Sequence, residues 1–283
     1  MFTRFAPSPT GELHLGHAYS AVLAHDAARR ADGYFLIRID DIDGSRSRAE
    51  YVDASLADLA WLGLEWHGDP VRQSARLGDY AAALDDLSAR GLVYPCFCTR
   101  ADVAASLSAP HGPSGTVYPG TCRNLSEAER IRRLADEPHC WRLDVTRAVA
   151  GAGDLLWEEA GRGTRVADPL AHGDIILARK DAPASYHLAS TLDDANMGVT
   201  HVIRGADLIA STDVHRLLQA LLGLPTPLYR HHALVCGPDG KRLAKRDAAA
   251  SLASLRAAGT DGSALAADLA ADRLPAGYFL QNP

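Results

Sequence analysis

The chain has 283 residues, of which 47% are hydrophobic and 23% charged, as in a soluble globular protein with two lobes or one domain carrying an insertion. Its start lacks the regions of a signal peptide, and no apolar run approaches the roughly 18 residues of a membrane span, so we expect neither a secreted nor a membrane protein. Five cysteines favour the reducing cytoplasm over a disulfide scaffold, and a net charge of −6 argues weakly against a nucleic-acid partner without excluding a local basic patch.

Hydrophobic patterns in the first ninety residues alternate between strands and helices. Strands are expected over residues 2–6 and 34–39, and helices over residues 16–31, 48–62 and 75–90. The second strand is mostly apolar, which is typical of a buried parallel strand. This order predicts the first half of a doubly wound, Rossmann-like parallel sheet over residues 1–92.

The pattern breaks after Gly91. Residues 93–171 combine cysteines, glycines, prolines and short strand-like pieces, and they are expected to form an inserted subdomain. The α/β alternation resumes over residues 172–225, the predicted second half of the Rossmann-like domain, with strands at 174–179 and 200–204 and helices near 186–195 and 212–222. Residues 226–283 hold a cationic loop and an Ala-rich tail that is expected to be helical.

Two histidines stand where the first strand is expected to turn into the first helix. His14 and His17 are three residues apart, so they share one face of a helical first turn. A helix N-terminus attracts anions, Gly16 permits close approach to the backbone, and imidazoles donate hydrogen bonds to phosphate oxygens. Far along the chain a cationic loop carries Arg242 and Lys245. Together these segments predict a site that binds a triphosphate from two sides.

These motifs resemble those of class I aminoacyl-tRNA synthetases of the glutamyl branch. The first ATP motif of that family is similar to His14-Leu15-Gly16-His17, and the second to Arg242-Leu243-Ala244-Lys245-Arg246. The amino-acid pocket of the branch resembles Arg4-Phe5-Ala6-Pro7-Ser8, Arg38-Ile39-Asp40-Asp41, Tyr186 and Val202-Ile203-Arg204-Gly205-Ala206-Asp207-Leu208. The similarity covers nearly the whole chain. It implies the class I fold, with a zinc-containing insertion and a C-terminal helical region that contacts a tRNA stem.

The resemblance also implies an enzyme that activates L-glutamate with ATP and Mg²⁺. The implied catalytic residues are His14, His17 and Lys245, and the implied ATP-binding residues are His14, Gly16, His17, Arg242 and Lys245. The implied glutamate-binding residues are Arg4, Phe5, Ala6, Pro7, Ser8, Asp40, Tyr186 and Arg204. Arg4 and Arg204 are the candidates to clamp the side-chain carboxylate, and Asp40 would face the α-ammonium group. The family usually has Glu at Asp40 and commonly Ser at Ala244, so this chain has a shorter carboxylate and one hydroxyl fewer.

A cysteine cluster lies in the insertion. By spacing alone, Cys96, Cys98 and Cys122 are compatible with a metal site or with plain buried thiols. The resemblance implies a structural Zn²⁺ held by Cys96, Cys98, Tyr118 and Cys122, whereas spacing would suggest His111 as the fourth ligand. The other cysteines are expected to pack in the core, and the remaining histidines, His187 and His231 among them, are expected to have surface or packing roles.

The length of the chain helps to predict which molecule accepts the glutamyl group. Full-length glutamyl synthetases carry a C-terminal anticodon-reading region, whereas this chain ends about 40 residues after Lys245. It thus resembles the stand-alone paralogues, which implies a monomer that transfers glutamate to queuosine at the wobble position in the anticodon stem-loop of tRNA(Asp). Alternatives are a truncated synthetase that charges the 3′ end of tRNA(Glu), an inactive RNA- or zinc-binding paralogue, and a small-molecule adenylate-forming ligase. The retained ATP motifs argue against the inactive paralogue, and the amino-acid pocket segments argue against the ligase.

Overall fold

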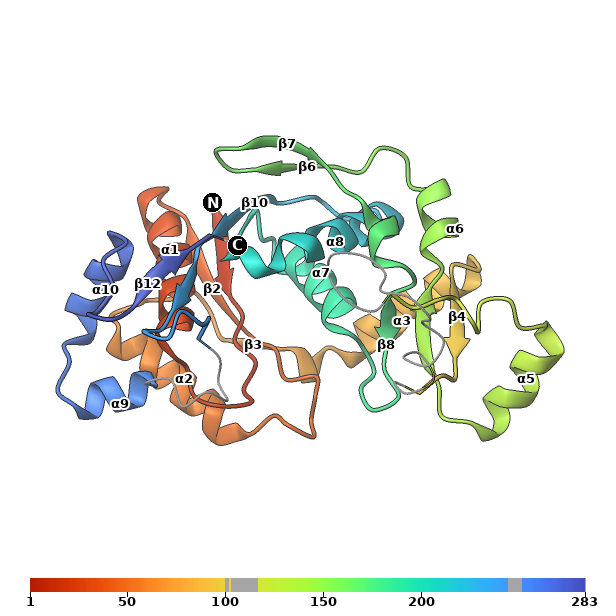
Figure 1. The fold of residues 1–283 in the computed structure, drawn as a ribbon, viewed down its shortest axis with the longest axis horizontal. Helices are drawn as coiled ribbons and strands as arrows, with labels where there is room; N and C mark the ends of the chain where they lie inside the picture. The colour runs from red at the N-terminus through yellow and green to blue at the C-terminus, as the bar shows by residue number, and fades with distance from the viewer. Residues whose placement is uncertain (100–101, 103–116, 244–250, 283) are drawn as a thin grey trace.

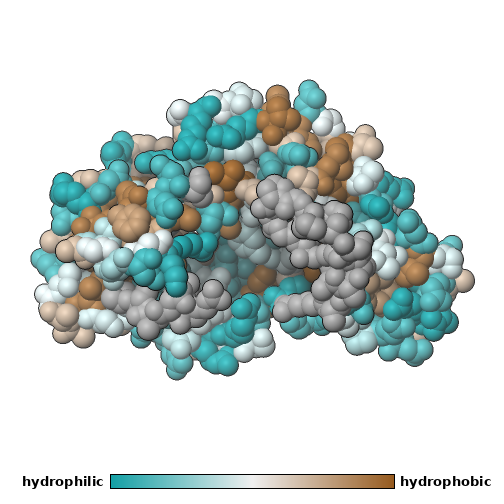
Figure 2. Space-filling view, viewed as in Figure 1, coloured by the Kyte–Doolittle hydropathy of each residue, from teal (hydrophilic) through white to brown (hydrophobic). Residues whose placement is uncertain are grey.

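The computed structural model describes residues 1–99, 102, 117–243 and 251–282 (Figure 1). Lys245, together with Ala244, Arg246 and His111, therefore lies outside the described residues. The molecule is elongated, and its N-terminus lies in the left half of the view (Figure 1). The face in view has a central hollow with a largely hydrophilic floor (Figure 2). Among the described residues, none of the helices has the length and apolar character needed to cross a membrane.

A three-stranded parallel sheet forms the N-terminal part of the fold. It consists of β1 (Phe2–Phe5), β2 (Tyr34–Ile39) and β3 (Val71–Arg72), in the order β1-β2-β3. The helix α1 (Leu15–Arg30) connects β1 to β2, and α2 (Ala49–Trp61) and the 3-10 turn η1 (Gln73–Ala75) flank β3. Because α1 packs on β1 and β2, its apolar side chains and the inner strand residues share one hydrophobic core.

A second sheet continues this arrangement. Its strands are β9 (His201–Gly205), β10 (Leu228–His232), β6 (Leu156–Glu159) and β7 (Gly163–Val166), in the order β7-β6-β10-β9. Strand β10 is parallel to both β9 and β6, and β6 and β7 form an antiparallel hairpin. The two sheets meet where Thr200 N donates to Phe2 O over 3.0 Å, so β9 begins beside β1. Parallel strands with helical connections confirm the predicted α/β class.

Helices and a turn connect the strands of the second sheet. They are α7 (Tyr186–Asn196), which ends shortly before β9, and η3 (Ala206–Leu208) and α8 (Ile209–Leu222), which connect β9 to β10. A second hydrophobic core forms where α7 and α8 pack together, and it extends to α3 (Leu77–Ala89) and α6 (Val145–Ala150).

The insertion has an antiparallel sheet of its own. It contains β4 (Val93–Cys96), β5 (Cys140–Leu143) and β8 (Ile176–Ala178), in the order β4-β5-β8, with α5 (Glu127–Asp136) between β4 and β5 in sequence and η2 (Pro169–His172) before β8. The prediction that residues 174–179 return to the parallel sheet was wrong, because β8 pairs antiparallel with β5. The hairpin β6–β7, predicted within the insertion, instead joins the second sheet through β10. These strands are only three or four residues long, and such short runs give no sequence signal of their partners.

The C-terminal region returns to the N-terminal half of the molecule (Figure 1). Strands β11 (Leu234–Cys236) and β12 (Phe279–Gln281) pair antiparallel, and α9 (Leu252–Ala257) and α10 (Gly262–Ala270) lie between them in sequence. Helix α10 packs against α1, and α9 contacts α2. The backbone N–H of Leu252 donates to Leu13 O over 2.8 Å, which connects the tail to the segment just before α1. The prediction of a helical tail is thus confirmed for the described residues.

Candidate active site

One cavity of about 450 Å³ brings together the predicted ATP and glutamate residues. All of those that the structure describes line it: Arg4, Phe5, Ala6, Pro7, Ser8, His14, Gly16, His17, Asp40, Tyr186, Arg204 and Arg242. They come from β1 and the loop after it, from the start of α1, from the ends of β2 and β9, from α7 and from the loop after β11. Because parallel strands β1, β2 and β9 point the same way, their carboxyl ends deliver these side chains to one edge of the fold.

The two histidines begin α1 as a reciprocal cap. His14 is the N-cap, and its Nδ1 accepts from Gly16 N over 3.2 Å, while His17 Nδ1 accepts from His14 N over 3.1 Å. Because each Nδ1 accepts a backbone N–H, each neutral ring carries its proton on Nε2. The ring centroids are 3.7 Å apart, so the two rings lie side by side at the positive end of the helix. This arrangement gives imidazole donors to an anion.

Glycine is required at position 16 by a local steric contact, in addition to the predicted close approach of a ligand to the backbone. A Cβ at this position would lie 3.2 Å from Cε1 and Nδ1 of His14, which is closer than ordinary van der Waals contact. A glycine therefore lets the His14 ring fold over the first turn and cap the helix. On the other side of the cavity, Arg242 donates to Asp207 over 2.8 Å and remains more than half exposed.

Arg204, at the end of β9, is buried among neutral acceptors. It is 5% exposed and donates to Tyr186 OH (3.2 Å), Thr212 Oγ1 (2.7 Å), Leu208 O (3.1 Å) and ring nitrogens of His231 (3.2 Å) and His215 (3.3 Å). Burial, with the charge of Arg204, lowers the pKa of His215 well below its usual value, so this ring stays neutral. A buried guanidinium without a direct carboxylate in these contacts is an anion receptor.

Arg4, the other candidate clamp, is already paired. Its Nε and Nη2 donate to the two carboxylate oxygens of Asp194 over 2.9 and 3.2 Å, and both residues are buried. Arg38 Nη1 donates to the same carboxylate over 2.6 Å. Burial raises the pKa of Asp194, but Arg4 and Arg38 outweigh it and hold that pKa below its usual value. The two predicted arginines thus differ: Arg4 has a protein carboxylate, and Arg204 has only uncharged partners among these contacts.

Asp40 lines the cavity and is held by an arginine of the preceding strand. Its two carboxylate oxygens accept from Arg38 Nε (2.6 Å) and Nη2 (3.3 Å), and its N–H donates to Pro7 O (3.0 Å). Burial raises the pKa of Asp40 despite the nearby Arg38. The shorter side chain noted in the sequence is thus held by the arginine two residues earlier.

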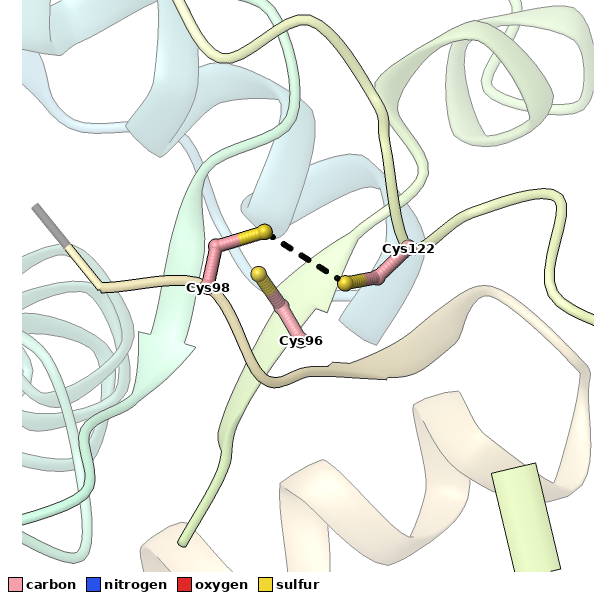
Figure 3. Close-up of side chains that lie close together, drawn as sticks. All are labelled: Cys96, Cys98 and Cys122. Atoms are coloured by element: carbon pink, nitrogen blue, oxygen red, sulfur yellow. Dashed lines mark hydrogen bonds between the residues drawn. The ribbon is translucent and has the colours of Figure 1, made fainter. Parts of the chain in front are cut away.

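The cysteine cluster converges in the insertion (Figure 3). The sulfur atoms of Cys96, Cys98 and Cys122 lie within 4.8 Å of one another, with Cys98 and Cys122 at 3.6 Å. Tyr118 OH lies 3.4 Å from the sulfur of Cys96 and 3.7 Å from that of Cys98. Ligands of a tetrahedral zinc lie about 3.8 Å apart for two sulfurs and about 3.5 Å for sulfur and oxygen. The four predicted donors therefore fit a zinc ion in size and chemistry.

Cys140 and Cys236 are buried, as predicted. Cys140 lies opposite Cys96 in the β4–β5 ladder and belongs to the same small core as the cysteine cluster. Its thiol lowers the pKa of the Cys96 thiol through a hydrogen bond. Cys236 lies outside the cluster, where its thiol donates to Gln281 Oε1 over 3.2 Å.

Sequence reasoning missed several residues of the cavity. One of them is His232, whose Nε2 lies 2.8 Å from Ser20 Oγ at the cavity wall. Arg38 lies in a predicted pocket motif, but its role of holding Asp40 was not predicted. His231 was assigned a packing role, but it hydrogen-bonds to Arg204 and to Glu159. Its only sequence signal is its position in the strand that follows α8. Recognising the contact requires the register of β10 on β9, in which His231 is opposite Arg204.

Comparisons with known proteins give consistent results. Residues 1–270 match the family described as class I tRNA synthetases (E and Q), catalytic domain. The chain is 48% identical to a glutamyl-Q tRNA(Asp) synthetase of Rhodobacter capsulatus, covering 92% of this chain and 96% of that protein. It is 45% identical to a protein of the same name from Symbiobacterium thermophilum, covering 94% of this chain and 84% of that protein.

A solved structure extends the likeness to three dimensions. The glutamate-tRNA synthetase of Elizabethkingia anophelis superposes with a TM-score of 0.73 at 28% identity, covering 87% of this chain. The chain spans about half of that protein, since the match covers 53% of its length. The fold and the sequence therefore lead to the same set of relatives.

Proposed function

The chain belongs to the family of class I tRNA synthetases for glutamate and glutamine and is a ligase, and from this premise we propose that it activates glutamate with ATP without tRNA. It then transfers the glutamyl group to queuosine at the wobble position of tRNA(Asp). The observation that carries the proposal is the shared cavity, which holds two helix-capping histidines and a buried guanidinium with uncharged partners. One part suits a triphosphate and the other a carboxylate.

In the activation step, a carboxylate oxygen of glutamate attacks the α-phosphorus of ATP. A carboxyl–phosphate bond forms, the bond to the β-phosphate breaks, and pyrophosphate leaves. His14 and His17 donate from Nε2 to phosphate oxygens as charge develops, and Arg242 and Lys245 supply further positive charge to the phosphates. Mg²⁺ that enters with ATP supplies further neutralisation of phosphate charge. Arg204, with Tyr186 beside it, binds the side-chain carboxylate of glutamate.

The remaining pocket residues complete the glutamate site. Arg4 acts mainly through Asp194, which it orients together with Arg38, and Ser8 adds a hydroxyl at the cavity wall. Asp40 faces the α-ammonium group, and Arg38 fixes its carboxylate there. In the transfer step, a hydroxyl oxygen of the acceptor attacks the glutamyl carbonyl carbon, the carboxyl–phosphate bond breaks and AMP leaves.

The acceptor assignment rests on the two relatives that share the name glutamyl-Q tRNA(Asp) synthetase and nearly the full length of this chain. The enzyme acts as a monomer in the cytoplasm, where ATP and tRNA are present. A structural zinc held by Cys96, Cys98, Tyr118 and Cys122 organises the insertion, which contacts the tRNA. When bound, zinc supplies a rigid tetrahedral connection between the chain segments that carry these residues.

The test is ATP–pyrophosphate exchange without tRNA, with glutamate, aspartate and glutamine as separate substrates. We expect exchange with glutamate alone, followed by labelling of queuosine-containing tRNA(Asp) and not of the same tRNA lacking queuosine. Exchange that requires tRNA(Glu) would replace the proposal with a truncated synthetase that charges the 3′ end. No exchange under either condition would indicate an inactive paralogue.

A further inference from the structure

His231, one of the partners of Arg204, also contacts Glu159, a carboxylate that is not among the residues lining the cavity. His231 accepts from Arg204 Nε at its Nε2 over 3.2 Å, and its Nδ1 lies 2.9 Å from Glu159 Oε2. Glu159 Oε1 accepts from the backbone N–H of His231, also over 2.9 Å. Glu159, His231 and Arg204 are 2%, 7% and 5% exposed, and we call them the buried triad.

The hydrogen bonds of the buried triad fix its tautomer. Arg204 can only donate and Glu159, when ionised, can only accept, so His231 must carry its proton on Nδ1 and present a lone pair at Nε2. Burial and the charge of Arg204 lower the pKa of His231, and the hydrogen bond that His231 donates to Glu159 does not overcome them. The ring is therefore neutral, and each of its nitrogens has one fixed role.

The order of the strands explains why Glu159 reaches Arg204 only through the ring of His231. Glu159 ends β6 of the β6–β7 hairpin (Figure 1), and His231 lies opposite Arg204 in the next strand pair. Arg165 is the nearest described cation on the far side, with Nε 3.9 Å from Glu159 Oε2, but it is 40% exposed. A carboxylate placed directly on Arg204 would neutralise its charge, as Asp194 does for Arg4. A carboxylate behind an imidazole offsets the buried charge while the direct partners of the guanidinium stay uncharged, so a ligand carboxylate competes only with neutral partners.

We infer that Glu159 and His231 are positioning residues, which orient Arg204 for the side-chain carboxylate of glutamate and so set the preference for glutamate over glutamine. This inference rests on the proposed function. The two residues touch neither ATP nor the reacting atoms. They act by orienting the guanidinium of Arg204, so their removal should raise KM for glutamate and leave KM for ATP unchanged.

The informative variant is Glu159→Gln. An amide at this position donates to His231 Nδ1, which moves the ring proton to Nε2 and sets two donors, Nε2–H and Arg204 Nε–H, against each other. Glu158→Gln is the matched control, because Glu158 is the preceding residue of the same strand, is exposed and contacts Thr164. We expect Glu159→Gln to raise KM for glutamate about 10- to 100-fold, as when outer partners of metal-binding histidines are removed.

Three readouts decide the inference. KM for ATP and the melting temperature report folding, and the kcat/KM ratio of glutamate to glutamine reports carboxylate selection. The inference holds if that ratio falls in Glu159→Gln, with KM for ATP within about twofold of the control. It is overturned if Glu159→Gln behaves as Glu158→Gln, or if KM for ATP rises by the same factor as KM for glutamate.

A fourth readout needs neither activity nor a variant. Nitrogen-15 NMR of the histidine rings in the wild-type protein should place the His231 proton on Nδ1, and a proton on Nε2 would overturn the inference even if exchange is normal. If the wild-type protein shows no glutamate-dependent exchange while the proton is on Nδ1, the proposed substrate fails and the hydrogen-bond arrangement stands. The two failures are thereby distinguished.

Discussion

At the scale of single residues, the two arginines of the cavity have the same side chain and opposite surroundings. Arg4 donates to both oxygens of Asp194, whereas the contacts of Arg204 are a phenol, a hydroxyl, a carbonyl and two imidazoles. A guanidinium paired to a protein carboxylate gains little from a second one. Selectivity for a ligand carboxylate therefore belongs to Arg204.

Arg204→Lys tests this assignment. Lysine keeps the charge but loses the planar fork, so we expect KM for glutamate to rise about 30-fold or more, the equivalent of about 2 kcal/mol for a hydrogen bond to a charged group. KM for ATP should change by less than about twofold. Both constants are read from pyrophosphate exchange. Equal losses for the two substrates would show that the substitution damages the fold instead.

The sequence could reach Arg204 but not its support. A resemblance to known motifs locates Arg204 and Tyr186 because they lie in short, recognisable segments. His231 and Glu159 are 27 and 45 positions away from Arg204, and they meet it only through the registers of β10 on β9 and of β6 on β10. The sequence of a short strand does not determine which strand it pairs with. From one sequence, residues such as His231 are therefore assigned only a surface or packing role.

At the scale of elements, the start of α1 has two functions in one motif. His14 and His17 cap the backbone through Nδ1 and line the cavity. A helix cap and a phosphate donor are therefore the same side chain, and an alanine substitution would remove both. Asparagine separates them, because it is among the best N-cap residues and has no imidazole.

We therefore predict that His14→Asn unfolds with nearly the wild-type free energy and that His14→Ala loses about 1 kcal/mol of it. Both variants should lose about 100-fold or more in the rate of pyrophosphate exchange, because each lacks the same donor to the phosphate. Urea unfolding and exchange assays on the two variants give these numbers. An Asn variant with normal exchange would remove His14 from catalysis and leave it as a cap alone.

The insertion is the element whose order depends most on its proposed ion. The third hydrophobic core contains few buried side chains besides the cysteines and the aromatic rings of Tyr94, Phe97 and Tyr118. Small cores of this kind usually need a metal or disulfides for stability. Among the described cysteines all are free thiols, so the metal is the candidate.

Cys122→Ser should lower the zinc content from about one ion per chain to well below one and lower the melting temperature, since one of three thiolates is lost. Cys236→Ser is the matched control, a buried cysteine outside the cluster, and should keep the full zinc content. Metal analysis after gel filtration measures both. Equal zinc in the two variants, or none in the wild-type protein, would reject the site.

At the scale of the whole molecule, the predictable part of the fold is its parallel half. The spacing of hydrophobic residues along the sequence predicts elements such as β2 and α1. Their observed bounds differ from the predicted ones by at most one residue. The insertion was harder to predict. Strand β8, expected in the parallel sheet, pairs antiparallel with β5, and the β6–β7 hairpin, expected within the insertion, pairs with β10. Their placement depends on long-range pairing, and the pattern of three or four residues does not encode it.

Buried histidines near Arg204 also determine how the molecule responds to acid. Burial lowers the pKa of His187 to about 4, lowers that of His215 well below its usual value and lowers that of His231 to about 4. Above pH 6.5 these rings are neutral in both the folded and the unfolded chain. As the pH falls below 6.5 the unfolded chain takes up protons first, so the free energy of unfolding decreases until the folded pKa values are reached.

Between pH 7.5 and 5.5, His187 and His231 should each lower the free energy of unfolding by about 1.4 kcal/mol, and His215 acts in the same direction. Asp58 acts in the opposite direction, since burial raises its pKa to about 6 and the folded chain takes up its proton in this window. Urea unfolding should thus give a lower free energy of unfolding at pH 5.5 than at pH 7.5. His187→Gln should reduce that difference by about 1.4 kcal/mol, because glutamine does not titrate. Equal stability at both pH values would mean that these rings are not held neutral, and the uncharged surroundings assigned to Arg204 would then have to be abandoned.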